Sequence, residues 1–173
     1  CHLMDVVKRA AKDRVPVLAG VTASHIEKSI DFAKYASEIG CAAIVCSPPY
    51  YYTVTQEMIE SHYEMLAEAV LDMSIVMYNI PLFSTPLSYD LVKRVSTIPN
   101  VVAMKDSSGS IVDMIHFMDK VRLIGSDINI LSGREENVFT STMLGGKGAM
   151  VGTGTIFPEI LVKIYNATLA GDH

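Results

Sequence analysis

The sequence predicts a parallel α/β fold arranged as a (β/α)8 barrel. Six short apolar runs alternate with longer segments of helical periodicity, and no Gly/Ser-rich linker separates them. Polar and aromatic residues directly follow most of these runs. A barrel draws its functional groups from several loops at the carboxyl ends of its strands, whereas an open doubly wound sheet concentrates them at one switch point. The scattered distribution therefore favours a barrel, forming a single domain over residues 1–173.

The apolar runs are the predicted strands. They are rich in β-branched residues and lack alternating polar ones, which is typical of strands buried on both faces of a parallel sheet. The predicted strands cover residues 15–19, 42–46, 75–78, 101–104, 128–131 and 149–151.

Helix-starting residues mark several of the segments between these runs. Ser24 and Glu27 have the spacing of a capping box, and Pro158 suits the first turn of a last helix that Gly171 ends. The predicted helices run from Ser24 towards Gly40, from Thr55 through Ala69, from Ser88 through Val95 and from Glu159 to Ala170.

The composition limits the possible partners and cofactors. Half of the 173 residues are hydrophobic and the formal net charge is −5, as in a globular protein. The 14 Lys and Arg residues form no basic tract, which argues against nucleic acid and anionic membranes as partners. No uncharged apolar run approaches the roughly 18 residues of a membrane helix. The three cysteines lack metal-ligand spacing and no targeting segment is visible, so we expect free thiols, no metal and a cytoplasmic location.

Lys105 is the sharpest chemical signal in the sequence. It directly follows the apolar run 101–104 and precedes small polar residues. At the mouth of a barrel, loss of water disfavours the ammonium form, and a neutral amine there can attack a ketone to form a Schiff base. The alternative is a lysine that extends from the strand end into solvent.

Tyrosines follow two other strands. Tyr78 ends the run 75–78, where a phenol could transfer the proton released as a carbinolamine collapses. It could equally be a half-buried tyrosine whose hydroxyl is simply satisfied. Tyr51 lies in the triple Tyr50-Tyr51-Tyr52 after Pro48-Pro49, which predicts a rigid aromatic loop at a subunit interface, in the site, or in both.

Other polar strand-end residues leave two interpretations open. Glu135 and Glu136 could accept hydrogen bonds from sugar hydroxyls, or could lie solvated at the start of a helix. The glycine-rich segments 145–148 and 152–155 match no phosphate-binding fingerprint, so an open-sheet nucleotide-binding protein has little support. The five histidines fall on predicted helices or chain ends, which disfavours a metal site or a catalytic triad.

Together these motifs resemble the pyruvate-dependent class I aldolase family that includes dihydrodipicolinate synthase and N-acetylneuraminate lyase. The motifs occur in the family's order, at its strand ends and over nearly the whole chain. They are Pro49-Tyr50-Tyr51, Tyr78-Asn79-Ile80-Pro81, Lys105-Asp106-Ser107-Ser108-Gly109, Leu131-Ser132-Gly133 and Leu144-Gly145-Gly146-Lys147-Gly148.

The resemblance implies a role for each matching residue. Lys105 would form a Schiff base with pyruvate, with no other cofactor, and Tyr78 would be the general acid/base. Tyr51 would enter the site of a neighbouring subunit, which implies a homodimer or homotetramer acting on a 2-oxo acid and an aldehyde. The residues implied to line the substrate cavity or bind substrate hydroxyls are Ser107, Gly133, Glu135, Glu136 and, through a nearby backbone carbonyl, Met150.

One departure from the family pattern concerns the aldehyde. Dihydrodipicolinate synthases carry an arginine in the segment that here reads Pro81-Leu82-Phe83-Ser84. Leu and Phe cannot replace a bidentate donor to the second carboxylate of aspartate semialdehyde. We therefore expect reversible cleavage of a 2-keto-3-deoxy sugar acid or a related 2-oxo acid. The alternatives are a dihydrodipicolinate (4-hydroxy-tetrahydrodipicolinate) synthase and a non-catalytic barrel relative.

The second departure concerns length. A complete barrel typically takes about 250 residues and eight strands, whereas 173 residues and six predicted strands are present. Met4–Arg14 matches the family's second helix, so the first strand, first helix and second strand are expected to be missing. The Gly-Thr-Thr-Gly-Glu-like turn, which in the family supplies the pyruvate carboxylate site, is expected to be missing with them. The family's C-terminal helices are expected to be missing too. We expect the chain to be a fragment of a longer one.

Overall fold

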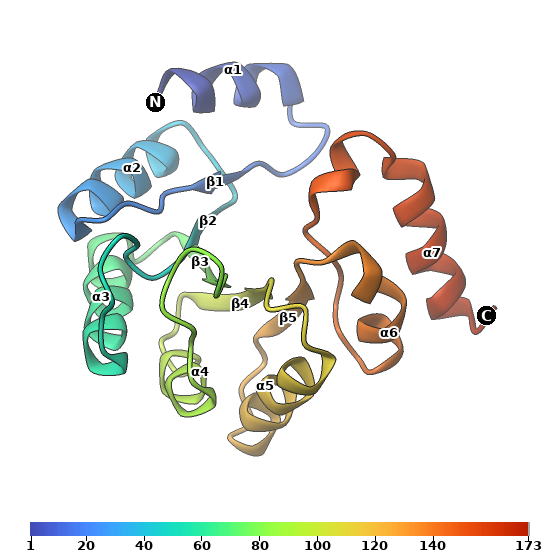
Figure 1. Cartoon of the computed structure of the whole chain (residues 1–173). Coiled ribbons are helices and arrows are strands. Elements are labelled where there is room, and N and C mark those ends of the chain that lie inside the picture. Colours follow the sequence, from blue (N-terminus) through green and yellow to red (C-terminus); the bar gives the residue numbers. More distant parts are fainter. Residues whose placement is uncertain (173) are drawn as a thin grey trace.

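A computed structural model describes residues 1–172 of the chain. Helices and strands alternate almost throughout it (Figure 1). The strands are β1 (Leu18–Gly20), β2 (Ala43–Cys46), β3 (Ser74–Asn79), β4 (Val101–Asp106) and β5 (Asn129–Ser132). The α-helices are α1 (His2–Ala11), α2 (Ile26–Glu38), α3 (Gln56–Ala69), α4 (Tyr89–Val95), α5 (Ile111–Leu123), α6 (Val138–Met143) and α7 (Pro158–Ala170). Two short 3-10 helices cover Glu135–Asn137 and Gly152–Thr155.

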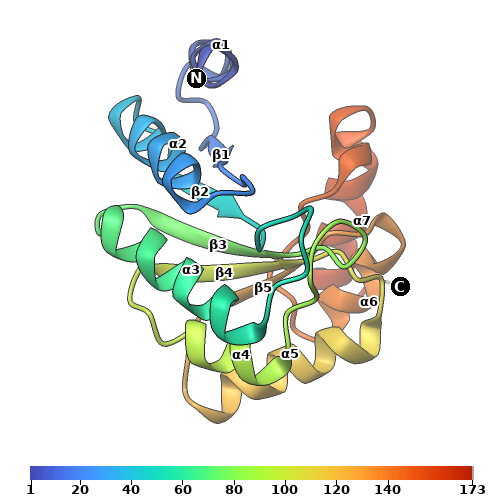
Figure 2. The ribbon, with the colours of Figure 1, turned by 60° about the vertical axis from the view of Figure 1, so that its left-hand side comes forward.

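The five strands form one parallel sheet in the order β1-β2-β3-β4-β5. Each strand pairs with the next one along the chain, and the order never reverses, as it would in a doubly wound sheet. The helices lie around the outside of the strands (Figure 1), and Figure 2 shows α3, α4 and α5 along one side of the sheet. The predicted α/β barrel architecture is confirmed, as an incomplete barrel that is open between α1 and α7.

The prediction of a strand over 149–151 is wrong. This segment makes a single parallel bridge, between Ser132 and Ala149, and the amide of Met150 donates to the carbonyl of Ser132 at 2.8 Å. Gly148 precedes the bridge with a φ of 151°, and a 3-10 helix begins at Gly152, so only a short piece of backbone is extended. The first strand is also shorter than predicted, because β1 begins at Leu18.

The predicted helix starts are partly confirmed. The side chains of Thr55 and Ser88 accept hydrogen bonds from backbone amides in the first turns of α3 and α4. The capping box at Ser24 is wrong, because α2 begins at Ile26 after His25 and has no side-chain cap. At the other end of the chain, Pro158 opens α7 as predicted.

The ends of the terminal helices follow from backbone conformation. Gly171 ends α7 in the left-handed conformation, with a φ of 73°, which glycine adopts without strain. Helix α1 ends at Ala11 rather than at the predicted Arg14, because Lys12 and Asp13 both have positive φ angles. Among residues 1–172, no helix is long and apolar enough to cross a membrane.

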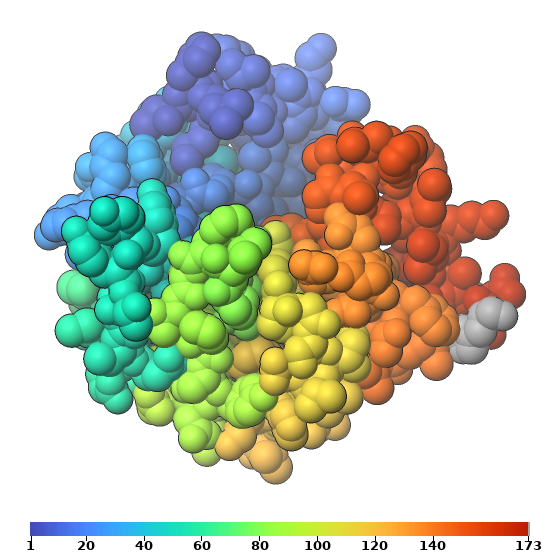
Figure 3. Space-filling view, viewed as in Figure 1, coloured from blue at the N-terminus to red at the C-terminus, as the bar shows by residue number. Residues whose placement is uncertain are grey.

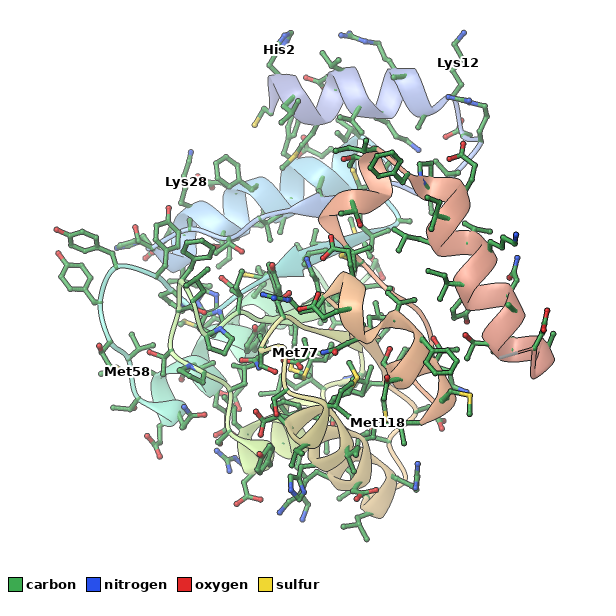
Figure 4. All side chains as sticks on the ribbon, turned by 45° about the vertical axis from the view of Figure 1, so that its right-hand side comes forward. His2, Lys12, Lys28, Met58, Met77 and Met118 are labelled. Atoms are coloured by element: carbon green, nitrogen blue, oxygen red, sulfur yellow. The ribbon has the colours of Figure 1, made fainter. Side chains whose placement is uncertain are left out.

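The two faces of the sheet are packed differently. The outer face and the helices share the main apolar core, in which Met77 and Met118 lie, whereas Met58 points to solvent (Figure 4). The inner face carries a small cluster of Ala43, Val76 and Ala103. The expectation that strands are buried on both faces fails at the edge strands β1 and β5, where exposed and buried residues alternate. Figure 3 shows a notch between the N-terminal and C-terminal segments, where the barrel is open.

A buried thiol–imidazole pair joins the sheet to α3. The Sγ of Cys46, the last residue of β2, lies 3.5 Å from Nε2 of His62, and the hydroxyl of Tyr63 donates to the carbonyl of Cys46 at 2.8 Å. Burial lowers the pKa of His62 to about 4 and raises the pKa of Cys46 to about 12. Both side chains are therefore neutral near pH 7 and belong to the packing of the fold.

The pair predicts an acid-sensitive contribution to stability. Because the pKa of His62 is lower in the folded protein than its ordinary value of 6.5, the unfolded chain binds the proton more readily. The contribution of neutral His62 is fully present above pH 6.5 and is lost as the pH falls towards 4. We expect the free energy of unfolding to decrease by roughly 3 kcal/mol over this interval. Urea denaturation of the unaltered protein and of His62→Gln across this range measures the difference, and parallel pH curves would contradict the assignment.

Candidate active site

Tyr78 and Lys105 face each other on the inner side of the sheet. They are register partners in the β3–β4 ladder, and Nζ of Lys105 lies 4.1 Å from the centre of the Tyr78 ring. Their neighbours Met77 and Met104 are fully buried in the outer core. Because successive side chains of a strand point to opposite faces, this burial turns Tyr78 and Lys105 inward. The structure thus brings together the two residues that the sequence marks most strongly.

Ser107 and Gly133 complete this group. The Ser107 hydroxyl lies 3.5 Å from the Tyr78 hydroxyl and 3.4 Å from the carbonyl oxygen of Gly133. A Cβ at position 133 would lie 2.0 Å from the Ser107 oxygen and 2.9 Å from Cε of Lys105. The absence of a side chain at Gly133 therefore leaves room for both groups.

Two buried polar residues directly behind this group were not predicted as site residues. Asn79 follows Tyr78 and Asp106 follows Lys105, and their side chains hydrogen-bond on the outer side of the sheet. Burial raises the pKa of Asp106, while hydrogen bonds from Ser108 and Asn79 oppose that rise. Strand alternation was the available signal, because the residue after an inward lysine must point outward.

The predicted pair of carboxylates is engaged within the chain. Glu135 accepts a hydrogen bond from the backbone amide of Thr153 at 2.9 Å, and this bond lowers the pKa of Glu135. Glu136 is paired with Arg134, whose terminal nitrogen lies 2.6 Å away, and this contact lowers the pKa of Glu136. Binding of substrate hydroxyls by these carboxylates remains a prediction.

Met150 lines a groove to which Lys105 does not contribute. It lines an apolar groove of about 460 Å³ together with Val138, Val151, Leu161 and Tyr165, between the segment that follows β5 and helix α7. Neither Lys105 nor Tyr78 lines this groove. The Met150 backbone stays close to the site through its bond to Ser132, so only its backbone fits the predicted role.

Tyr51 is not part of the Lys105 group within one chain. Its side chain is 83% exposed, its φ is 84°, and its ring packs edge-to-face against Tyr52 with 4.8 Å between the ring centres. The loop is anchored to the segment after β3 by an antiparallel bridge between Tyr50 and Ser84. The structure therefore presents Tyr51 at the surface on an anchored loop.

The described part of the chain, residues 1–172, contains no group of three or more His, Cys, Asp or Glu side chains that could hold a metal ion. The three cysteines are free, and Cys41 and Cys46 are buried.

The close packing around Gly133 gives a testable prediction. We expect Gly133→Ala to lower the free energy of unfolding by about 1–3 kcal/mol, because the added methyl group must displace Ser107 and Lys105. Gly20→Ala is the matched control, since Gly20 also lies at a strand end and nothing lies within 4 Å of a Cβ placed there. The control should change stability by less than about 0.5 kcal/mol. Equal urea midpoints for the two variants would contradict this account of Gly133.

Comparison with known proteins places this geometry in a family. Residues 1–173 match the dihydrodipicolinate synthetase family. The 4-hydroxy-tetrahydrodipicolinate synthase of Azoarcus sp. (strain BH72) is 32% identical over 173 residues, covering 99% of this chain and 58% of the relative. The chain thus spans less than two thirds of that relative's length.

Solved structures agree with this match. Dihydrodipicolinate synthase from Bacteroides thetaiotaomicron superposes with a TM-score of 0.90 and 31% identity, covering 99% of this chain and 57% of that one. The enzyme from Acinetobacter baumannii, solved in complex with pyruvate, gives a TM-score of 0.88 and 29% identity, covering 98% and 58%. Because the family match extends over all 173 residues, the resemblance in the sequence is confirmed, and the chain belongs to the dihydrodipicolinate synthetase family.

Proposed function

We propose that this protein is a class I, pyruvate-dependent carbon–carbon lyase in which Lys105 forms a Schiff base. The observation that carries the proposal is the position of the Lys105 amine, 4.1 Å from the centre of the Tyr78 ring on the inner face of the sheet. The space beside it is kept open by Gly133. The complex of the Acinetobacter baumannii enzyme with pyruvate supports this choice of substrate.

The proposed reaction begins with covalent catalysis by the amine. Neutral Lys105 attacks the C2 carbonyl carbon of pyruvate, and the carbonyl electron pair moves to the oxygen to give a carbinolamine. That oxygen leaves as water while the C=N bond of a protonated imine forms. Loss of a proton from C3 gives an enamine, whose C3 attacks the carbon of an aldehyde. Hydrolysis of the resulting imine releases the product and restores the amine, and the reverse sequence cleaves a 2-oxo acid.

Tyr78 is proposed to move the protons. Its phenol protonates the carbinolamine oxygen as water leaves, and the resulting phenolate takes up a proton in a later step. The Ser107 hydroxyl, 3.5 Å from the Tyr78 hydroxyl, is placed to pass a proton towards substrate or solvent.

For the aldehyde we propose aspartate semialdehyde, the substrate of the lysine-pathway synthase. The Azoarcus relative is named 4-hydroxy-tetrahydrodipicolinate synthase, and both compared structures are dihydrodipicolinate synthases. These names favour the synthase over the sugar-acid lyase that the residues alone suggest.

A 2-keto-3-deoxy sugar acid is the second candidate, and a specific observation favours it. Leu82 and Phe83 are exposed in the segment where the synthases carry an arginine. In the loops that follow the carboxyl ends of the five described strands, Arg134 is the sole Lys or Arg, and its guanidinium is paired with Glu136. The proposed contacts for sugar hydroxyls are Ser107, Glu135 and Glu136.

We further propose that a second copy of the chain supplies Tyr51 to the site. The exposed ring and the anchoring of its loop through Tyr50 and Ser84 support an intermolecular role. A homodimer or homotetramer is therefore expected, and a strictly monomeric active protein would contradict the assignment.

Borohydride trapping tests the Schiff base. With pyruvate present, the full-length protein should gain the mass of one reduced pyruvate adduct on the peptide that contains Lys105. Lys105→Ala should lose the adduct completely and keep its fold, whereas Lys93→Ala, the control at an exposed lysine of α4, should retain it. Retention of the adduct in Lys105→Ala would refute the assignment, and no adduct in the unaltered protein would favour a non-catalytic relative.

A competition between aldehydes separates the two candidate substrates. We expect the protein to condense pyruvate with aspartate semialdehyde at least roughly tenfold faster than with glyceraldehyde, in terms of kcat/KM. Product formation is followed by mass spectrometry, with Lys105→Ala as the blank. The opposite preference would assign the protein to the sugar-acid lyases, and Glu135→Gln should then weaken glyceraldehyde use selectively.

A further inference from the structure

Asn79 and Asp106 form a buried pair one residue beyond Tyr78 and Lys105. They are register partners at the carboxyl ends of β3 and β4 and are only 2% and 3% exposed. The Asn79 side-chain amide donates to Oδ1 of Asp106 at 2.7 Å. We call these two side chains the Asn79–Asp106 clasp.

The clasp also binds the loops that follow the two strands. Oδ1 of Asn79 accepts the backbone amide of Leu87 at 3.0 Å, which closes the segment between β3 and α4. Asp106 accepts the backbone amide of Ser108 on Oδ1 at 3.2 Å and the Ser108 hydroxyl on Oδ2 at 2.8 Å. Each side chain of the clasp therefore hydrogen-bonds to the other and to the loop that follows its own strand.

The backbones of the clasp residues hold the inner group. The amide of Ser107 donates to the carbonyl of Asn79 at 2.9 Å, and the amide of Gly133 donates to the carbonyl of Asp106 at 2.7 Å. Three neighbouring strand ends, those of β3, β4 and β5, thus meet at two buried residues. The positions of Ser107 and Gly133 on the inner face therefore depend on the backbones of Asn79 and Asp106.

We propose that the Asn79–Asp106 clasp positions Lys105 and Tyr78 for reaction, although neither clasp side chain touches the substrate. The proposal rests on the proposed function for its link to turnover. Displacement of a reacting group by about 1 Å can cost roughly a hundredfold in rate, so a small relaxation of the strand ends is sufficient.

Variants of the clasp can test whether the contacts of Asp106 or its negative charge position the inner residues. In Asp106→Asn the amide oxygen can accept from Asn79 and from the Ser108 amide, and the new NH2 can donate to the Ser108 hydroxyl. This variant removes the negative charge and keeps the contacts. Asp106→Ala and Asn79→Ala remove the contacts.

A partly buried amide elsewhere in the sheet offers a control of the same residue type. Asn100 lies at the opposite end of the sheet, directly before β4, where its side-chain amide lies within 3.1–3.3 Å of the carbonyls of Ala67, Val70 and Met73. Asn100→Ala removes the same chemical group and several hydrogen bonds, but at a distance from Lys105 along the strand. This variant shows how far a general loss of stability alone slows adduct formation on Lys105.

The experiment measures two quantities in the full-length protein and each variant. The first is the rate of borohydride-trapped adduct formation at saturating pyruvate, normalised to the folded fraction. The second is hydrogen exchange at the amides of Ser107 and Gly133. We expect Asn79→Ala and Asp106→Ala to slow adduct formation roughly 10- to 100-fold and to speed exchange at both amides. Asp106→Asn and Asn100→Ala should keep both values near those of the unaltered protein.

Each other outcome overturns a stated part of the proposal. If Asn79→Ala slows the adduct no more than Asn100→Ala does, the clasp is only structural. If Asp106→Asn is as slow as Asp106→Ala, the charge of Asp106 acts rather than its contacts. If Asp106→Ala does not fold, Ser108→Ala, which removes the donor to Oδ2 of Asp106 and the acceptor of the Ser110 amide, should give an intermediate loss. If the unaltered protein forms no adduct, the proposed function fails, and exchange at the two amides alone decides whether the clasp holds the strand ends.

Discussion

The pairing register between β3 and β4 is the constraint on which the rest of the site depends. It sets Tyr78 opposite Lys105 on the inner face and Asn79 opposite Asp106 on the outer face. A slip of one residue would reverse both faces, placing the amine among the methionines of the core and the carboxylate in the barrel mouth. The buried methionines and the buried hydrogen bond between Asn79 and Asp106 both oppose such a slip, because each would lose its environment.

Much of the fold could be predicted because its signals are local. The caps at Thr55 and Ser88 and the opening of α7 at Pro158 depend on residues within one helical turn, and all three are confirmed. Ser24 carries the same local signal, yet α2 begins at Ile26 after His25 and has no side-chain cap. The segment 149–151 reads as a strand by composition, but pairing depends on neighbours and on the conformation of the flanking glycines.

The site could be predicted where its residues lie at the ends of predicted strands. Lys105 and Tyr78 are recognisable because they lie at the ends of two predicted strands in motifs that match the family's order, and the structure places them together. The packing role of Gly133 and the outward pair behind the site depend on contacts between segments far apart in the sequence. The partner of Glu135 could not be predicted from the sequence either, because it is the backbone amide of Thr153, which lies 18 positions further along the chain.

The side chains beneath Lys105 and Tyr78 on the inner face bear on which aldehydes the proposed reaction could use. Ala43, Val76 and Ala103 form its small apolar cluster, and Val76 and Ala103 lie two residues before Tyr78 and Lys105 on their strands, about 6–7 Å deeper in the barrel. None of these three side chains has a polar atom that could take part in proton transfer. If the proposed reaction takes place above this cluster, enlarging Ala103 would fill the space beneath Lys105 and favour shorter aldehydes, whereas trimming Val76 would widen that space. The proposed aldehyde preference could thus be altered at these positions without changing Lys105 or Tyr78.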